Sequence, residues 1–137
     1  MAEHVIVRQN NRFEIEFKAA GEHDGEMRPV TQLHELSPYT MLLAGLGACT
    51  AIVVNTYAQH HKIKLEAVEL GLRYTRDFQE DCENCETIER YEEVIKEEVS
   101  FSGELSDDER QKLFRIAHQC PIHKMLESGV EIKSTHI

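Results

Sequence analysis

The feature that most constrains this chain is an uncharged segment, residues 36–59, with an apolar centre over residues 41–54. Ser37 followed by Pro38 predicts a helix start, because the serine oxygen can cap free amides and proline at the first helical position loses no hydrogen bond. We expect the helix to run to about His60. It is apolar nearly all round, so we expect it at the centre of the fold. The apolar centre is too short to span a bilayer, so we expect no membrane segment.

Small residues recur along this segment. Glycines inside a helix cost about 1 kcal/mol each, a cost that packing usually offsets. We therefore expect a neighbouring backbone to approach this helix closely. The small residues are Ala44, Gly45, Gly47, Ala48 and Ala51.

Apolar and polar residues alternate with a period of two in three other places, which predicts strands. Residues 5–18 predict an N-terminal hairpin, residues 68–75 a strand, and residues 130–135 a closing strand. Residues 20–36 predict a loop followed by a short extended piece. Residues 88–101 fit both a helical stripe and a strand face, and periodicity alone favours a helix.

Two further helices are predicted near the C-terminus. Ser106 followed three residues later by Glu109 is a capping-box pattern. Cys120 followed by Pro121 predicts the start of a short helix that ends near Gly129. The order of elements therefore predicts a single α+β domain over residues 1–137.

Composition excludes several classes of function. The chain carries 25 Asp and Glu against 15 Lys and Arg, a formal net charge of −10, so phosphate backbones and anionic lipid surfaces are repelled. We expect no nucleic-acid or membrane partner. The N-terminus has no basic region followed by an apolar stretch, so we expect a cytoplasmic protein in which cysteines are metal-binding, redox-active or buried.

Cys49 and Cys120 differ in their predicted surroundings. Cys49 lies in the middle of the long helix among small residues, where a cysteine is more often a small buried hydrophobe than a catalytic group. Cys120 is the predicted N-cap of a helix. Free amides and the positive end of the helix dipole lower a thiol pKa there, although simple capping or packing is an equal alternative.

The two cysteines lie in a pair of motifs that resembles a known family. Residues 37–50 (SPYTMLLAGLGACT) and residues 117–126 (AHQCPIHKML) resemble the OsmC/Ohr family of thiol-dependent hydroperoxide reductases. The resemblance implies an OsmC-like fold with a long central cysteine-bearing helix, N-terminal and further strands, and two C-terminal helices. It implies an intertwined homodimer with active sites at the subunit interface. It also implies that residues 88–101 form a strand.

The resemblance further implies peroxide chemistry. Cys49 would be the peroxidatic thiol that attacks a small hydroperoxide, and Cys120 the resolving thiol that condenses with the sulfenic acid. An external dithiol would restore both thiols. No flavin, haem or nicotinamide motif is present, so we expect no such cofactor.

The sequence departs from the family where the family has a glutamate directly after the helix-starting proline. That position is Tyr39, for which first-turn packing is the simpler interpretation. The family glutamate orients an arginine that stabilises the thiolate, so its loss puts fast turnover in doubt. Arg28 is the preferred candidate for this arginine and Arg12 the alternative, and each could equally be a solvated surface residue.

Cys82 and Cys85 form a second cysteine feature. They could supply two of the four ligands of a structural zinc site, with the others from a partner chain or from His60 or His61. A redox role is weakened because neighbouring acidic residues raise a thiol pKa. An inert exposed pair is the slightly favoured interpretation.

The remaining polar residues give weaker signals. His118 and His123 flank Cys120 and could tune it, but solvated or capping roles are simpler. The glutamates within residues 92–98 are interpreted as a solvated face. The leading hypothesis is a hydroperoxide reductase; the alternatives are a non-enzymatic dimer that binds a small molecule or senses oxidation, and a structural metal-binding dimer.

Overall fold

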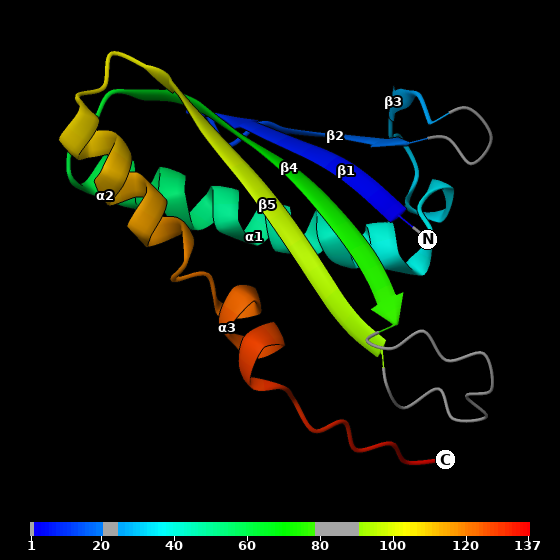
Figure 1. Cartoon of the computed structure of the whole chain (residues 1–137). Coiled ribbons are helices and arrows are strands. Elements are labelled where there is room, and N and C mark those ends of the chain that lie inside the picture. The colour runs from blue at the N-terminus through cyan, green and yellow to red at the C-terminus, as the bar shows by residue number, and fades with distance from the viewer. Residues whose placement is uncertain (1, 21–24, 79–90) are drawn as a thin grey trace.

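We describe a computed structural model over residues 2–20, 25–78 and 91–137. Its centre is a five-stranded antiparallel sheet in the order β3-β2-β1-β4-β5 (Figure 1). The two longest strands, β4 and β5, pair with each other and β5 forms one edge. The strands are β1 (Ala2–Asn10), β2 (Ile15–Ala20), β3 (Met27–Pro29), β4 (Leu65–Phe78) and β5 (Tyr91–Gly103).

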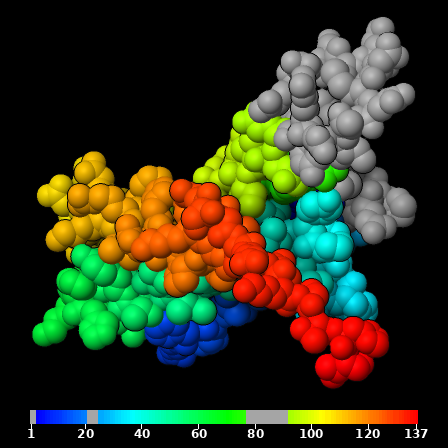
Figure 2. Space-filling view, turned by 90° about the horizontal axis from the view of Figure 1, so that it is seen from below, coloured from blue at the N-terminus to red at the C-terminus, as the bar shows by residue number. Residues whose placement is uncertain are grey.

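One face of this sheet is covered by helices. The long helix α1 packs along β1 and β4, and α2 and α3 pack against α1 (Figure 1). In the space-filling view, α2 and α3 lie over α1, and the C-terminal residues extend away from the body (Figure 2). The helices are the short 3-10 helix η1 (Leu33–Glu35), α1 (Pro38–His60), α2 (Asp107–Ala117) and α3 (Pro121–Ser128). The predicted α+β class and OsmC-like order of elements are confirmed.

Alternation along the strands builds the core. Val5 and Val7 of β1 are fully buried, and they lie opposite Leu72 and Leu70 of β4, which are also fully buried. The intervening residues point to the other face of the sheet. Burying these apolar side chains stabilises the fold, because each contributes about 1.5–3 kcal/mol when removed from water.

Gly47 explains how α1 comes so close to the sheet. A Cβ atom at this position would lie 2.6 Å from Cγ2 of Val7 and 2.9 Å from Cδ1 of Leu72. The predicted close approach is therefore confirmed at Gly47. Gly45 is different, because a Cβ atom there would meet nothing within 4 Å.

The predicted helix starts are confirmed by their caps. The Oγ of Ser37 accepts a hydrogen bond from the amide of Thr40 at 3.2 Å. Ser106 and Glu109 form the reciprocal capping box at the start of α2. Cys120 is the N-cap residue of α3, although its side chain makes no capping hydrogen bond.

Several sequence predictions are wrong. Residues 130–135 form no strand: Val130 is 61% exposed and Ile132 82% exposed, and the segment has no sheet neighbour among the described residues. A strand needs a neighbour for its backbone hydrogen bonds, and alternation alone does not provide one. The helical interpretation from periodicity is also wrong over residues 91–103, which form β5 as the family resemblance implied. The extended piece after the first loop is residues 27–29.

The expectation that the apolar centre is too short for a membrane concerns residues 41–54, whereas the helix that contains them is longer. By length and composition alone, α1 is long and apolar enough to cross one. Half of its apolar window is buried inside the fold, where it contacts β1 and β4. These contacts are those of a core helix.

Candidate functional site

The structure brings Cys49 and Cys120 together. Cys49 is partly buried in the middle of α1, and Cys120 is fully buried at the start of α3. Both are free thiols. The Cys120 thiol and the backbone N–H of Ile122 both lie close enough to the Cys49 sulfur to shift its pKa. Seventy residues of sequence therefore separate two thiols that are neighbours in space.

The surroundings of Cys49 favour its neutral thiol. Burial and the hydrogen bond with the Cys120 thiol raise the pKa of Cys49 above its usual value. The N–H of Ile122 acts in the opposite direction but is outweighed. A raised pKa means that less of Cys49 is thiolate at neutral pH, so its reaction as a nucleophile is slowed.

A cavity of about 600 Å³ lies next to the segments that carry the two cysteines. Leu42 and Leu46 of α1 line it on the turns that precede Cys49. His118 and His123, which flank Cys120, line it from the C-terminal helices. The other lining residues are Tyr39, Tyr74, Glu93, Ile95, Glu97, Leu126 and Glu127.

Tyr39 packs within this cavity. Its ring stacks on the ring of Tyr74, with centroids 4.6 Å apart and planes inclined by 17°. The hydroxyl of Tyr74 donates a hydrogen bond to Glu93 at 2.6 Å. That hydrogen bond raises the pKa of Tyr74. Tyr39 thus has the packing role expected of it, and it lines the cavity.

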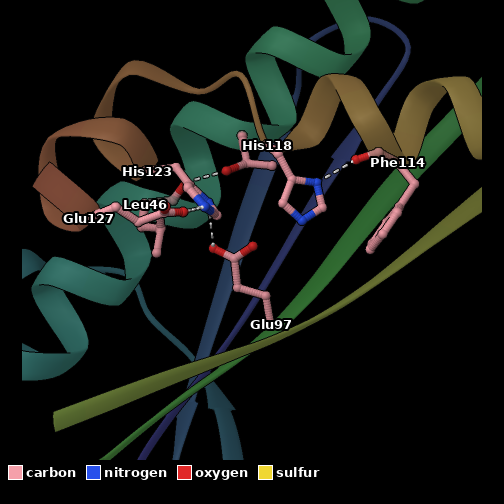
Figure 3. A network of polar contacts seen from close by, with 7 residues as sticks. Leu46, Glu97, Phe114, His118, His123 and Glu127 are labelled. Atoms are coloured by element: carbon pink, nitrogen blue, oxygen red, sulfur yellow. Dashed lines mark hydrogen bonds and ion pairs between the residues drawn. The ribbon is translucent and has the colours of Figure 1, made fainter.

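A polar network joins β5 to the C-terminal helices (Figure 3). The imidazole of His123 contacts the carboxylate of Glu127 through Nε2, and its Nδ1 lies 3.9 Å from Oε1 of Glu97. The His118 ring lies edge-on to that of His123, with centroids 5.4 Å apart. His118 also hydrogen-bonds the carbonyl oxygen of Phe114 at 2.8 Å. His118 therefore has the expected capping role, whereas His123 belongs to an acid–base network.

Glu97 is a residue that sequence reasoning missed. Its side chain is only 15% exposed, so the interpretation of this run as a solvated face is wrong here. Burial raises the pKa of Glu97, and the nearby histidines oppose this only in part. Once β5 is a strand, Glu93 and Glu97 share a face with Ile95. The two-residue alternation of a strand was therefore the sequence signal that could have identified these two glutamates as facing the same side as Ile95.

The two candidate arginines lie on the N-terminal strands. Arg28 is in β3, opposite Ala19, where its guanidinium lies 3.6 Å from Glu26 and is 60% exposed. Arg12 is exposed in the turn between β1 and β2. Among the described residues, no arginine is one of the groups that shift the pKa of Cys49. A role for either arginine therefore stays a prediction.

The two cysteines of the predicted metal site, Cys82 and Cys85, lie outside the described residues. Within the described ranges, no group of three or more His, Cys, Asp or Glu side chains is arranged to hold a metal ion. A zinc site at the cysteine pair is therefore untested.

Comparison with known proteins identifies related sequences and folds. The model of the OsmC-like protein family matches residues 31–135, which include both motifs and all four cysteines. No match was found among curated protein sequences.

Two crystal structures are similar to this chain. The first is an OsmC-like hydroperoxide resistance protein from Jannaschia sp. CCS1, with a TM-score of 0.64 and 13% identity, covering 96% of this chain and 90% of that one. The second is an organic hydroperoxide resistance protein OsmC from Legionella pneumophila, with a TM-score of 0.54 and 18% identity, covering 95% of this chain and 93% of that one. At such identities the similarity establishes the fold alone.

Proposed function

This chain belongs to the OsmC-like protein family, and from that premise we propose that it reduces organic or related hydroperoxides with its own thiols. The Cys49 thiolate attacks one oxygen of the hydroperoxide and the O–O bond breaks. The sulfur is oxidised to a sulfenic acid, and the other oxygen takes up a proton and leaves as an alcohol. The Cys120 thiol then attacks the sulfenic sulfur, forming a disulfide and releasing water. An external dithiol is oxidised as it returns both thiols.

The observation that carries this proposal is the contact between Cys49 and Cys120. A resolving thiol must reach the sulfenic sulfur before another oxidant does, and a direct neighbour needs little movement. The names of the two similar structures, both hydroperoxide resistance proteins, support the choice of substrate.

A second candidate function rests on the raised pKa of Cys49. Because burial and the Cys120 thiol hold Cys49 in its neutral form, the pair is suited to slow oxidation. Tyr39 also stands where the family places the glutamate that orients its arginine. The alternative is therefore a dimer that binds a small molecule or senses oxidation, with slow or no turnover.

We place the protein in the cytoplasm as a homodimer. The net charge of −10 and the free thiols support a soluble protein in a reducing compartment. Apolar side chains on the outer face of α1 support the dimer, since Met41 and Ile52 are 39% and 48% exposed. In this proposal a second copy covers that face.

Peptide mass spectrometry after one equivalent of cumene hydroperoxide tests the peroxidase reaction. We expect a disulfide between Cys49 and Cys120 in the reduced wild-type protein, and its absence in Cys49→Ser. The Cys120→Ser variant is the matched control and should accumulate the Cys49 sulfenic acid, trapped with dimedone. A slow disulfide with little turnover in the presence of dithiothreitol favours the sensor. If both thiols stay reduced, or only Cys82 and Cys85 join, the peroxidase proposal is wrong.

A structural zinc site at Cys82 and Cys85 is a separate proposal. Two thiolates supply half of a tetrahedral zinc site, and a partner chain would complete it. We expect about one zinc per dimer in protein purified without chelator, and none in the Cys82→Ser variant. Metal-free protein of unchanged thermal stability would contradict it.

A further inference from the structure

The cavity beside the cysteine motifs has an acidic lining. Glu93 and Glu97 enter it from β5 and Glu127 from α3. Carboxylates only accept hydrogen bonds when ionised. Among the described residues that line the cavity, none is a lysine or an arginine, although Arg76 on β4 lies 4.0 Å from Glu93. Even with Arg76 counted, the cavity is negative by two charges while its histidines are neutral.

One of these carboxylates has an unused acceptor. Oε1 of Glu97 is buried and makes no hydrogen bond within the described part of the chain. Nδ1 of His123 lies 3.9 Å from this oxygen, which is too long for a hydrogen bond. A buried carboxylate oxygen without a donor is costly, so this position favours a ligand that brings an N–H or O–H group.

The rest of the wall suits the carbon skeleton of a small organic molecule. The stacked rings of Tyr39 and Tyr74 form part of the lining. Leu42, Leu46 and Leu126 contribute apolar surface. Aromatic faces attract cations, and mostly apolar cavities with a few placed polar groups are typical small-molecule sites.

We propose that this cavity binds a small organic cation, an amine with an apolar or aromatic body whose ammonium group faces Glu97. One consequence of this inference also rests on the proposed function. If the chain is a hydroperoxide reductase, its preferred hydroperoxide carries an amine and not a carboxylate. A carboxylate-bearing molecule would meet three glutamates of like charge. Its binding would therefore be disfavoured at neutral pH.

The charge of the cavity depends on pH through all the groups that face it. Protonation of His118 and His123 adds positive charge, and protonation of Glu97 removes negative charge. Because burial raises the pKa of Glu97, this carboxylate loses its charge at a higher pH than an ordinary glutamate. Cation affinity should therefore fall as the pH is lowered.

Isothermal titration calorimetry of the reduced protein at pH 7.5 tests the site with matched probes, benzylamine and benzoate. We expect benzylamine to bind at least tenfold more tightly than benzoate. Glu97→Gln keeps the shape and removes the charge, so it should weaken benzylamine binding at least tenfold. The control is Glu98→Gln, which lies on the same strand but points to the other face of the sheet.

The possible outcomes distinguish binding in the cavity from long-range attraction by the net negative charge of the chain. Equal weakening by Glu98→Gln and Glu97→Gln would overturn the proposal in favour of long-range attraction. Benzylamine binding that is absent, unchanged in Glu97→Gln or weaker than benzoate binding would overturn it as well.

This binding experiment involves no oxidation, so it is independent of the peroxidase proposal. If benzylamine binds tightly but the cysteines do not react with hydroperoxide, the cation-site proposal is supported and the peroxidase proposal is wrong. If Cys49 does react with hydroperoxides, peptide mass spectrometry should show that an amine-bearing hydroperoxide oxidises Cys49 faster than its carboxylate-bearing counterpart does. The opposite order of rates would overturn the substrate class.

Discussion

At the scale of single residues, the proposed peroxide chemistry depends on how Cys49 is held. An isolated cysteine in the middle of a helix is usually a packing residue, and the partial burial of Cys49 is consistent with that. Contact with Cys120 changes the interpretation, because two free thiols in contact can form a disulfide when one is oxidised. The Cys120 thiol also raises the pKa of Cys49, so in the proposed mechanism the arrangement that aids resolution would slow the first attack.

Removing the Cys120 thiol should make Cys49 more acidic. In Cys120→Ala the neighbouring thiol no longer raises the pKa of Cys49, while burial still does. We expect the pH profile of Cys49 alkylation by iodoacetamide to shift to lower pH but to stay above that of an unperturbed cysteine peptide. Peptide mass spectrometry separates this signal from Cys82 and Cys85. A pH profile that does not shift, or that shifts to higher pH, would contradict the conclusion that the Cys120 thiol raises the pKa of Cys49.

At the scale of elements, the packing of α1 on the sheet depends on Gly47. Its small size allows α1 to approach Val7 and Leu72, so the helix tolerates an intrinsically poor helix former. The neighbouring Gly45 has no such contact. The two glycines therefore allow a matched test of close packing.

Gly47→Ala should destabilise the protein and Gly45→Ala should not. Overpacking typically costs about 1–3 kcal/mol, while alanine gains up to about 1 kcal/mol of helix propensity. We expect a lower free energy of unfolding for Gly47→Ala and an unchanged or higher one for Gly45→Ala. Urea denaturation at one fixed protein concentration measures both. Equal values for the two variants would mean that α1 does not contact the sheet as described.

At the scale of the whole molecule, the single chain leaves apolar surface uncovered. The outer face of α1 exposes part of Met41 and Ile52, and the C-terminal residues leave Val130 and Ile132 in solvent. These surfaces are expected in a protomer that a second copy covers, as in the proposed dimer.

A charge on the outer face of α1 should disrupt the proposed homodimer. Ile52→Glu places a carboxylate in that apolar face, and burying it without a partner is unfavourable. We expect wild-type protein to sediment as a dimer and Ile52→Glu as a monomer or a concentration-dependent mixture. Gln111→Glu, on the exposed side of α2, is the control and should remain dimeric. A fully dimeric Ile52→Glu would exclude this face as the interface.

Sequence reasoning identified the two motif cysteines but missed part of the site around them. Cys49 and Cys120 were found through a resemblance, since neither has local surroundings that require catalysis. The sequence predicts a solvated residue at Glu97, because a run of glutamates is usually exposed. Its burial depends on α2 and α3 lying across β5, which no local pattern in residues 92–98 indicates.

The sequence by itself determined the features that depend on near neighbours along the chain. Ser37 and Ser106 cap helices because their acceptors are three residues from the amides they satisfy, and alternation alone set which faces of β1 and β4 are buried. Only the tertiary structure decided that Cys49 contacts Cys120, that Glu97 faces a cavity, and that residues 130–135 remain unpaired. These three features depend on how distant segments pack. Each is decided by whether a residue far along the chain lies beside the segment in the folded protein.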